Sequence, residues 1–100
     1  MEYNKLVRDN IPEIIKSKGD LPIIHTAEEK EYTEALTRKL HEEVEEFLEK
    51  PSVEEAADIV EVLRAICELK GIDLSTLEEV RQQKATERGS FKQRIILERT

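Results

Sequence analysis

The segment LHEEVEEFLEKPSVEEAADIV, residues 40–60, decides the fold because it joins two helical patterns through a break of about three residues. Pro51 ends the first helix, and Ser52 is a good N-cap for the second. A connection this short requires the two helices to pack antiparallel. The first of them has apolar residues at spacings of four and three, which is typical of one helix face: Tyr32, Leu36, Leu40, Val44, Phe47 and Leu48.

Capping residues set the limits of this central pair. The helix before Pro51 is expected to start near Thr26, with Glu29 as its capping-box partner, and to end near residue 49. The next helix is expected to run from Ser52 to about residue 70, with Gly71 as a left-handed stop.

A further helix is expected on each side of the pair. The N-terminal one begins near Asn10 and ends at Gly19, and residues 21–24 form an extended connection. The C-terminal one begins at Asp73 or at Ser75, where Ser75 and Glu78 form a second capping-box pattern, and ends at Gly89. Residues 90–100 hold several apolar side chains, and the pattern leaves open whether they form a helical turn, a strand or a subunit contact.

These patterns predict one all-α domain over residues 1–100, a four-helix bundle-like fold with an antiparallel central pair. Hydrophobic residues make up 38% of the chain, mostly aliphatic, and Gly and Pro number only three each. A chain of this size buries a modest share of its surface, so we expect it to associate into a homodimer or homotetramer.

Charge and cysteine content limit the partners and the compartment. Asp and Glu outnumber Lys and Arg by 23 to 16, and a net charge of −7 disfavours nucleic acid and anionic membranes as partners. The single cysteine, Cys67, lies in an apolar segment and is expected in the core rather than as a nucleophile. Without an apolar run long enough to cross a bilayer, the chain is expected to be soluble and cytoplasmic.

Two acidic pairs flank the break, Glu43 with Glu46 and Glu55 with Asp58, each three residues apart. Such a spacing is close to one helical turn, so the pairs can face each other across the hairpin. Carboxylates that converge in this way repel one another unless a cation lies among them, and Mg²⁺ or Mn²⁺ takes oxygen ligands of this kind.

An ordinary explanation competes with the metal site. Acidic helix faces are usually solvated, and Glu55 can serve as the capping-box partner of Ser52. Against this, Glu43 intrudes on the apolar face of its helix, and Glu55 and Asp58 lie on a helix that is apolar almost all round. A carboxylate on a buried face requires a partner.

Two basic pairs are candidate phosphate-binding residues. Lys84 and Arg88 lie four residues apart on one helix face, and Lys5 and Arg8 offer a similar arrangement near the N-terminus. The alternative is an exposed basic face, which a helix C-terminus favours in any case.

With these residues the chain resembles the all-α nucleoside triphosphate pyrophosphohydrolases, the MazG-like superfamily. The acidic signature of that family corresponds here to Glu42-Glu43-Val44-Glu45-Glu46 and Glu55-Ala56-Ala57-Asp58, and its later basic element to Lys84 and Arg88. The stretch from Tyr3 to Pro12 is similar to the start of a small single-domain subgroup that is phosphoribosyl-ATP pyrophosphohydrolase-like.

The resemblance implies Mg²⁺-dependent cleavage of a nucleoside triphosphate into a monophosphate and pyrophosphate, with house-cleaning of non-canonical nucleotides as one role. It implies a metal held by Glu43, Glu46, Glu55 and Asp58. Glu42 becomes a candidate for the outer shell of the metal or for orienting the attacking water, and Glu42 and Glu43 are the candidate catalytic residues. The candidate phosphate-binding residues are Lys84, Arg88, Lys5 and Arg8.

Two other functions stay open at this point. Phosphoribosyl-ATP pyrophosphohydrolase performs the same chemistry on a different nucleotide, and the metal motif does not separate the two. A non-catalytic helical module that dimerises or binds a partner would also have this composition.

Overall fold

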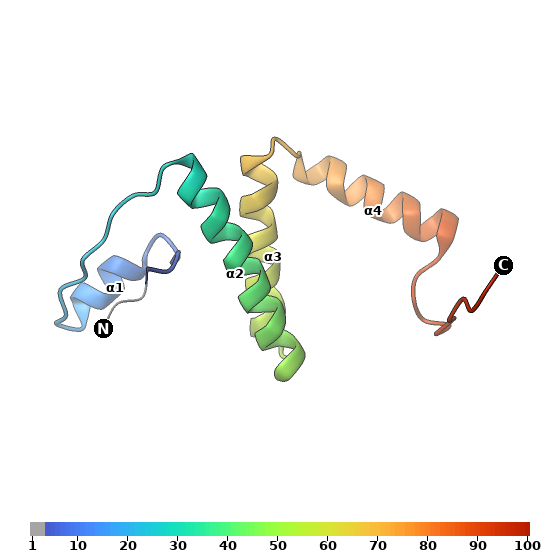
Figure 1. The fold of residues 1–100 in the computed structure, drawn as a ribbon, viewed down its shortest axis with the longest axis horizontal. Coiled ribbons are helices and arrows are strands. Elements are labelled where there is room, and N and C mark those ends of the chain that lie inside the picture. Colours follow the sequence, from blue (N-terminus) through green and yellow to red (C-terminus); the bar gives the residue numbers. More distant parts are fainter. Residues whose placement is uncertain (1–3) are drawn as a thin grey trace.

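The computed structural model describes residues 4–100, in which all regular secondary structure is helical. Tyr3, where the stretch used for the N-terminal resemblance begins, lies outside the described residues. The prediction of an all-α chain is confirmed. In chain order the helices are α1 (Ile11–Ser17), α2 (Glu29–Glu49), α3 (Val53–Leu69) and α4 (Leu74–Arg88) (Figure 1).

The α2–α3 pair forms the centre of the molecule. Figure 1 shows the two helices side by side and running in opposite directions, as the short connection predicts. Only residues 50–52 separate them. The buried apolar side chains of the described part are Leu36 on α2 and Cys67 on α3, which are 2% and 3% exposed. Cys67 is therefore a core residue, as expected.

The flanking helices do not join this core within one chain. Among residues 4–100, α2 and α3 are the only helices in extensive contact, and Figure 1 shows α1 and α4 on opposite sides of the pair. The Cα radius of gyration is 17.8 Å, whereas a compact chain of this length has about 13 Å. The expected bundle-like packing of four helices is thus not formed inside a single chain, because α1 and α4 leave the pair through their connections.

Two caps were predicted correctly, and they fix where α3 and α4 begin. The Ser52 hydroxyl accepts a hydrogen bond from the Glu55 backbone N–H at 3.1 Å. The Asp73 carboxylate accepts one from the Thr76 N–H, also at 3.1 Å, so α4 starts at the first of its two predicted caps. Gly71, with φ of +72°, terminates α3 in the left-handed conformation that glycine adopts without strain.

The predicted start of α2 at Thr26 is wrong. The helix begins three residues later, with Glu28 at the N-cap in extended conformation and no capping side chain. The His25 imidazole, which precedes the helix, lies 2.9 Å from a carboxylate oxygen of Glu31 in the first turn of α2. Glu29 and Glu31 in that turn are favourable for the helix dipole.

Apolar side chains outside the central pair stay largely exposed. Residues 90–100 contain no helix or strand, and residues 21–24 lie in the connection between α1 and α2, also without helix or strand. The side chains more than three-fifths exposed in these two stretches are Leu21, Ile23, Ile24, Phe91, Ile95, Ile96 and Leu97. No helix in the described range is long and apolar enough to cross a membrane.

Candidate functional site

Three carboxylates meet across the α2–α3 pair. Glu43, Glu55 and Asp58 each contribute one oxygen, and these oxygens lie within 4.8 Å of one another. Glu43 belongs to the second half of α2, whereas Glu55 and Asp58 belong to the first turns of α3. The antiparallel hairpin therefore brings together residues from its two arms, as their spacing predicts. We call these three residues the carboxylate group.

Burial distinguishes this group from an ordinary acidic helix face. Glu43 is only 6% exposed, and among residues 4–100 it is the charged residue that counts as buried. Within residues 4–100, Oε2 of Glu43 and Oε2 of Glu55 are buried and have no hydrogen-bond partner. Buried carboxylate oxygens without a partner are energetically costly. Oxygen ligands of this kind suit a hard divalent cation, so these residues could hold Mg²⁺ or Mn²⁺.

Basic side chains offset part of the negative charge. Lys39 lies one turn before Glu43 on α2, with its Nζ 3.3 Å from Glu43 Oε1. Arg8 Nη2 donates a 2.8 Å hydrogen bond to Asp58 Oδ1. The ion pair of Arg8 ties the N-terminal segment to α3, although both side chains are more than a third exposed. An exposed pair of this kind contributes little to stability.

Glu42 lies beside the carboxylate group rather than in it. Lys5 Nζ donates a 2.8 Å hydrogen bond to Glu42 Oε1. This hydrogen bond holds the pKa of Glu42 below its usual value, helped by the charge of Lys39. It also raises the pKa of Lys5. Both groups are therefore charged near neutral pH, and Lys5 neutralises the carboxylate.

Glu46, the fourth predicted ligand, is exposed and lies outside the carboxylate group. Residues three apart on a helix differ by about 60° in direction. That difference is enough for Glu43 to face α3 while Glu46 faces solvent.

The two predicted phosphate-binding pairs have different positions. Lys5 and Arg8 lie against the site, where they contact Glu42 and Asp58. Lys84 and Arg88 lie on α4, which extends away from the α2–α3 pair in Figure 1. Within one chain, α4 does not bring its basic pair to the carboxylate group.

Sequence reasoning missed Lys39, which pairs with Glu43, and Arg38, which lies next to Lys39 and lines a hollow between α2 and the N-terminal segment. The signal that could have found Lys39 is its position four residues before Glu43, since residues at that spacing meet on a helix surface. The signal for Arg38 is weaker because it depends on where the N-terminal segment folds back.

Comparison with known proteins gives one partial relative. A protein of Mycolicibacterium smegmatis, described as uncharacterized, is 52% identical to this chain over 43 residues. The aligned stretch covers 43% of this chain and 44% of the relative, so less than half of either protein is matched. No family model matches the chain, and no solved structure is significantly similar to it.

Proposed function

We propose that the chain is a Mg²⁺-dependent nucleoside triphosphate pyrophosphohydrolase, which releases a nucleoside monophosphate and pyrophosphate. The observation that carries the proposal is the pair of buried, unpartnered carboxylate oxygens on Glu43 and Glu55, beside Asp58. The three residues occupy positions of the acidic motif through which the chain resembles the MazG-like enzymes.

In this proposal, the carboxylate group holds the metal, and Mn²⁺ is an alternative ion. Glu46 is a proposed fourth ligand, and its exposed side chain would have to turn toward the group. When bound, the metal would polarise phosphate oxygens, neutralise developing charge and lower the pKa of a bound water. The protein's part is to keep the ligands fixed on two packed helices.

The remaining residues act on water and on phosphate. Glu42 is proposed for the outer shell of the metal or for orienting the attacking water, because it is an ionised carboxylate next to Glu43 in the chain. Lys5 and Arg8 would exchange their carboxylate partners for phosphate oxygens. This exchange is inexpensive because both ion pairs are partly exposed.

A second copy of the chain would complete the fold. The open shape and the exposed apolar side chains of the C-terminal stretch support a homodimer or homotetramer, in which α4 and residues 90–100 pack on another subunit. In such an assembly Lys84 and Arg88 could serve the carboxylate group of a neighbouring subunit. A cytoplasmic location and a house-cleaning role belong to the same proposal.

The test is a pyrophosphate-release assay with canonical and modified nucleoside triphosphates and with phosphoribosyl-ATP, in Mg²⁺, in Mn²⁺ and in EDTA. We expect metal-dependent release, which Glu43→Gln and Asp58→Asn should each reduce by at least about a hundredfold. Glu45→Gln, an exposed change on the same helix, is the matched control and should retain activity. Folding of all variants is checked by circular dichroism.

The same assay separates the alternatives. Turnover confined to phosphoribosyl-ATP would favour the alternative that the chain is a phosphoribosyl-ATP pyrophosphohydrolase. Unchanged turnover in both variants would contradict the metal ligands proposed here. Silence with every nucleotide would favour the non-catalytic helical module, which the exposed apolar surface also suits.

A further inference from the structure

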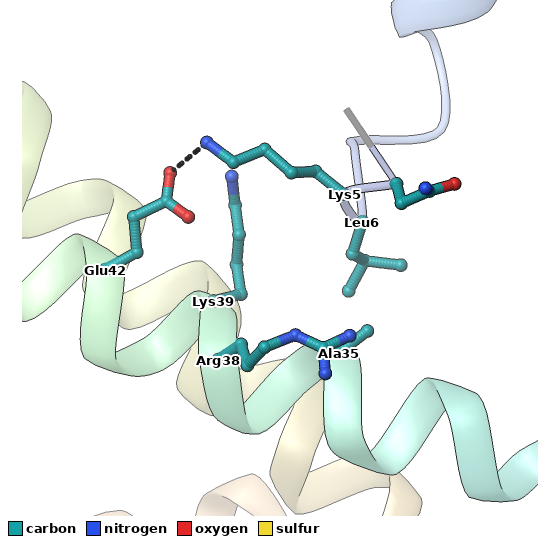
Figure 2. A pocket seen from close by; sticks show the side chains of 7 residues that line it. Lys5, Leu6, Ala35, Arg38, Lys39 and Glu42 are labelled. Atoms are coloured by element: carbon teal, nitrogen blue, oxygen red, sulfur yellow. Dashed lines mark hydrogen bonds and ion pairs between the residues drawn. The ribbon is translucent and has the colours of Figure 1, made fainter. Parts of the chain in front are cut away.

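A shallow hollow of about 250 Å³ lies between the N-terminal segment and α2 (Figure 2). Its lining comes from two parts of the chain that are far apart in sequence. The lining residues are Asn4, Lys5 and Leu6 on one side and Ala35, Arg38, Lys39 and Glu42 on the other.

The hollow is positively charged although the protein is acidic. Three of its side chains are basic and one is acidic, giving a local net charge of +2 in a chain whose net charge is −7. Lys5 is paired with Glu42 at 2.8 Å and Lys39 with Glu43 at 3.3 Å, which leaves the Arg38 guanidinium as the cation of the hollow without a carboxylate partner among residues 4–100. A concave basic surface on an acidic protein selects an anion.

The basic groups line the hollow at separate points. In Figure 2 the ammonium groups of Lys5 and Lys39 lie near the Glu42 carboxylate, while the Arg38 side chain lies farther along α2, below Leu6. An anion with several charged groups in a row fits this distribution better than a single phosphate. Arg38 makes no ion pair with any residue in the range 4–100, so its guanidinium can form forked hydrogen bonds to phosphate.

Lys39 connects the hollow to the carboxylate group. Its Nζ lines the hollow and lies 3.3 Å from Glu43 Oε1, so both sites share one side chain. A cation bound to Glu43 would replace Lys39 as the partner of that carboxylate and leave the ammonium available to an anion. The two sites are thus arranged to take a cation and a polyphosphate side by side.

We propose that this hollow is a polyphosphate-binding subsite, with Arg38 as its main binding residue and Lys5 and Lys39 as supporting ones. The ligand class is a linear oligophosphate, and its identification as the tail of a nucleotide substrate rests on the proposed function. The binding of the anion itself does not rest on it.

The probe is inorganic tripolyphosphate, titrated into the full chain by calorimetry at low salt in EDTA, where no metal contributes. Arg38→Gln should raise Kd by about five- to tenfold, as expected for the loss of one charged hydrogen-bond donor at an exposed site. Lys39→Gln should raise Kd by a smaller factor, because without a metal the Lys39 ammonium is shared with Glu43. Arg64→Gln on α3 and Lys30→Gln on α2 remove the same charge from exposed positions outside the hollow and should leave Kd within about twofold.

Equal weakening in all four variants, or no binding by the unmodified chain at millimolar tripolyphosphate, would overturn the subsite. A parallel Mn²⁺ titration separates this result from the fate of the metal proposal. Arg38→Gln and Lys39→Gln should bind Mn²⁺ at least as well as the unmodified chain, whereas Glu43→Gln should lose it. Arg38-dependent tripolyphosphate binding without Mn²⁺ binding would support the subsite and reject the metal.

Discussion

The central pair and the flanking parts of this chain differ in how much of their apolar surface they bury. The α2–α3 pair buries Leu36 and Cys67 and holds the carboxylate group. The C-terminal part beyond the pair leaves Leu97 77% exposed and Phe91 98% exposed. The pair also leaves Leu48 and Val53 exposed, so the hairpin buries only the seam between its two helices, whereas the flanks leave most of their apolar side chains exposed in a single chain.

The largest expected effect comes from comparing two leucine truncations. Leu36→Ala removes a buried side chain and should lower the free energy of unfolding by about 2–5 kcal/mol. Leu97→Ala should change it by less than about 0.5 kcal/mol if the tail is exposed in solution. Urea unfolding, read together with sedimentation to fix the oligomeric state, provides the measurement.

Oligomer formation would change this result in a specific way. If a second copy covers the tail, the apparent stability of the unmodified chain should rise with the logarithm of protein concentration, and Leu97→Ala should weaken association and lower that stability. If the protein is a monomer whose stability does not respond to Leu97→Ala, the proposed assembly is contradicted. The packing of α2 on α3 would not be affected by that result.

The two helix caps give a smaller, matched comparison. Ser52→Ala removes the cap of α3 and should destabilise the folded chain by about 1 kcal/mol, because α3 is part of the packed pair. Asp73→Ala removes the equivalent cap of α4 and should reduce helix content there without shifting the unfolding midpoint of the pair. Circular dichroism and urea midpoints measure both, and an equal shift in midpoint would mean that α4 is packed in solution.

The smallest expected effect is a change in the titration of the Glu78 carboxyl on α4 at acidic pH. Hydrogen bonds from Arg81, and then from Gln82, lower the pKa of Glu78 to about 2. Because the pKa is lower in the folded helix, the interaction is complete above the usual value of 4.5 and is lost as pH falls toward 2. Arg81→Gln should move the carboxyl titration, followed by NMR, back toward the usual value. An unchanged midpoint would mean that the pair does not form in solution.

The sequence predicted the hairpin well because its signals are local. Apolar spacing, Pro51 and the Ser52 cap each act within a few residues, and together they place Glu43 opposite the first turns of α3. Glu46 could not be separated from Glu43 by spacing alone, since the difference in direction of about 60° is smaller than an apolar stripe is wide.

What the sequence did not predict depends on contacts between distant residues. The start of α2 has no side-chain cap, and the His25–Glu31 contact in that region joins residues six apart, beyond the reach of the capping pattern at Thr26. The basic hollow exists only because Lys5 folds back onto α2, and no local pattern encodes that return. The position of α4 could not be predicted for a similar reason. Its local sequence predicts a helix but does not indicate which surface that helix contacts.

The connection between α1 and α2 has a consequence for how the site is reached. It spans residues 18–28 and has neither a helix nor a strand, so Lys5 and Arg8 behave as a ligand on a tether rather than as part of a rigid wall. A tether of this length sets an effective concentration in the range of about millimolar. A phosphate group that binds Lys5 and Arg8, or a cation that binds Glu42 and Asp58, has to compete with these two intramolecular ion pairs. Occupancy of the site by its own N-terminus is therefore a matter of competition, and it falls as ionic strength rises.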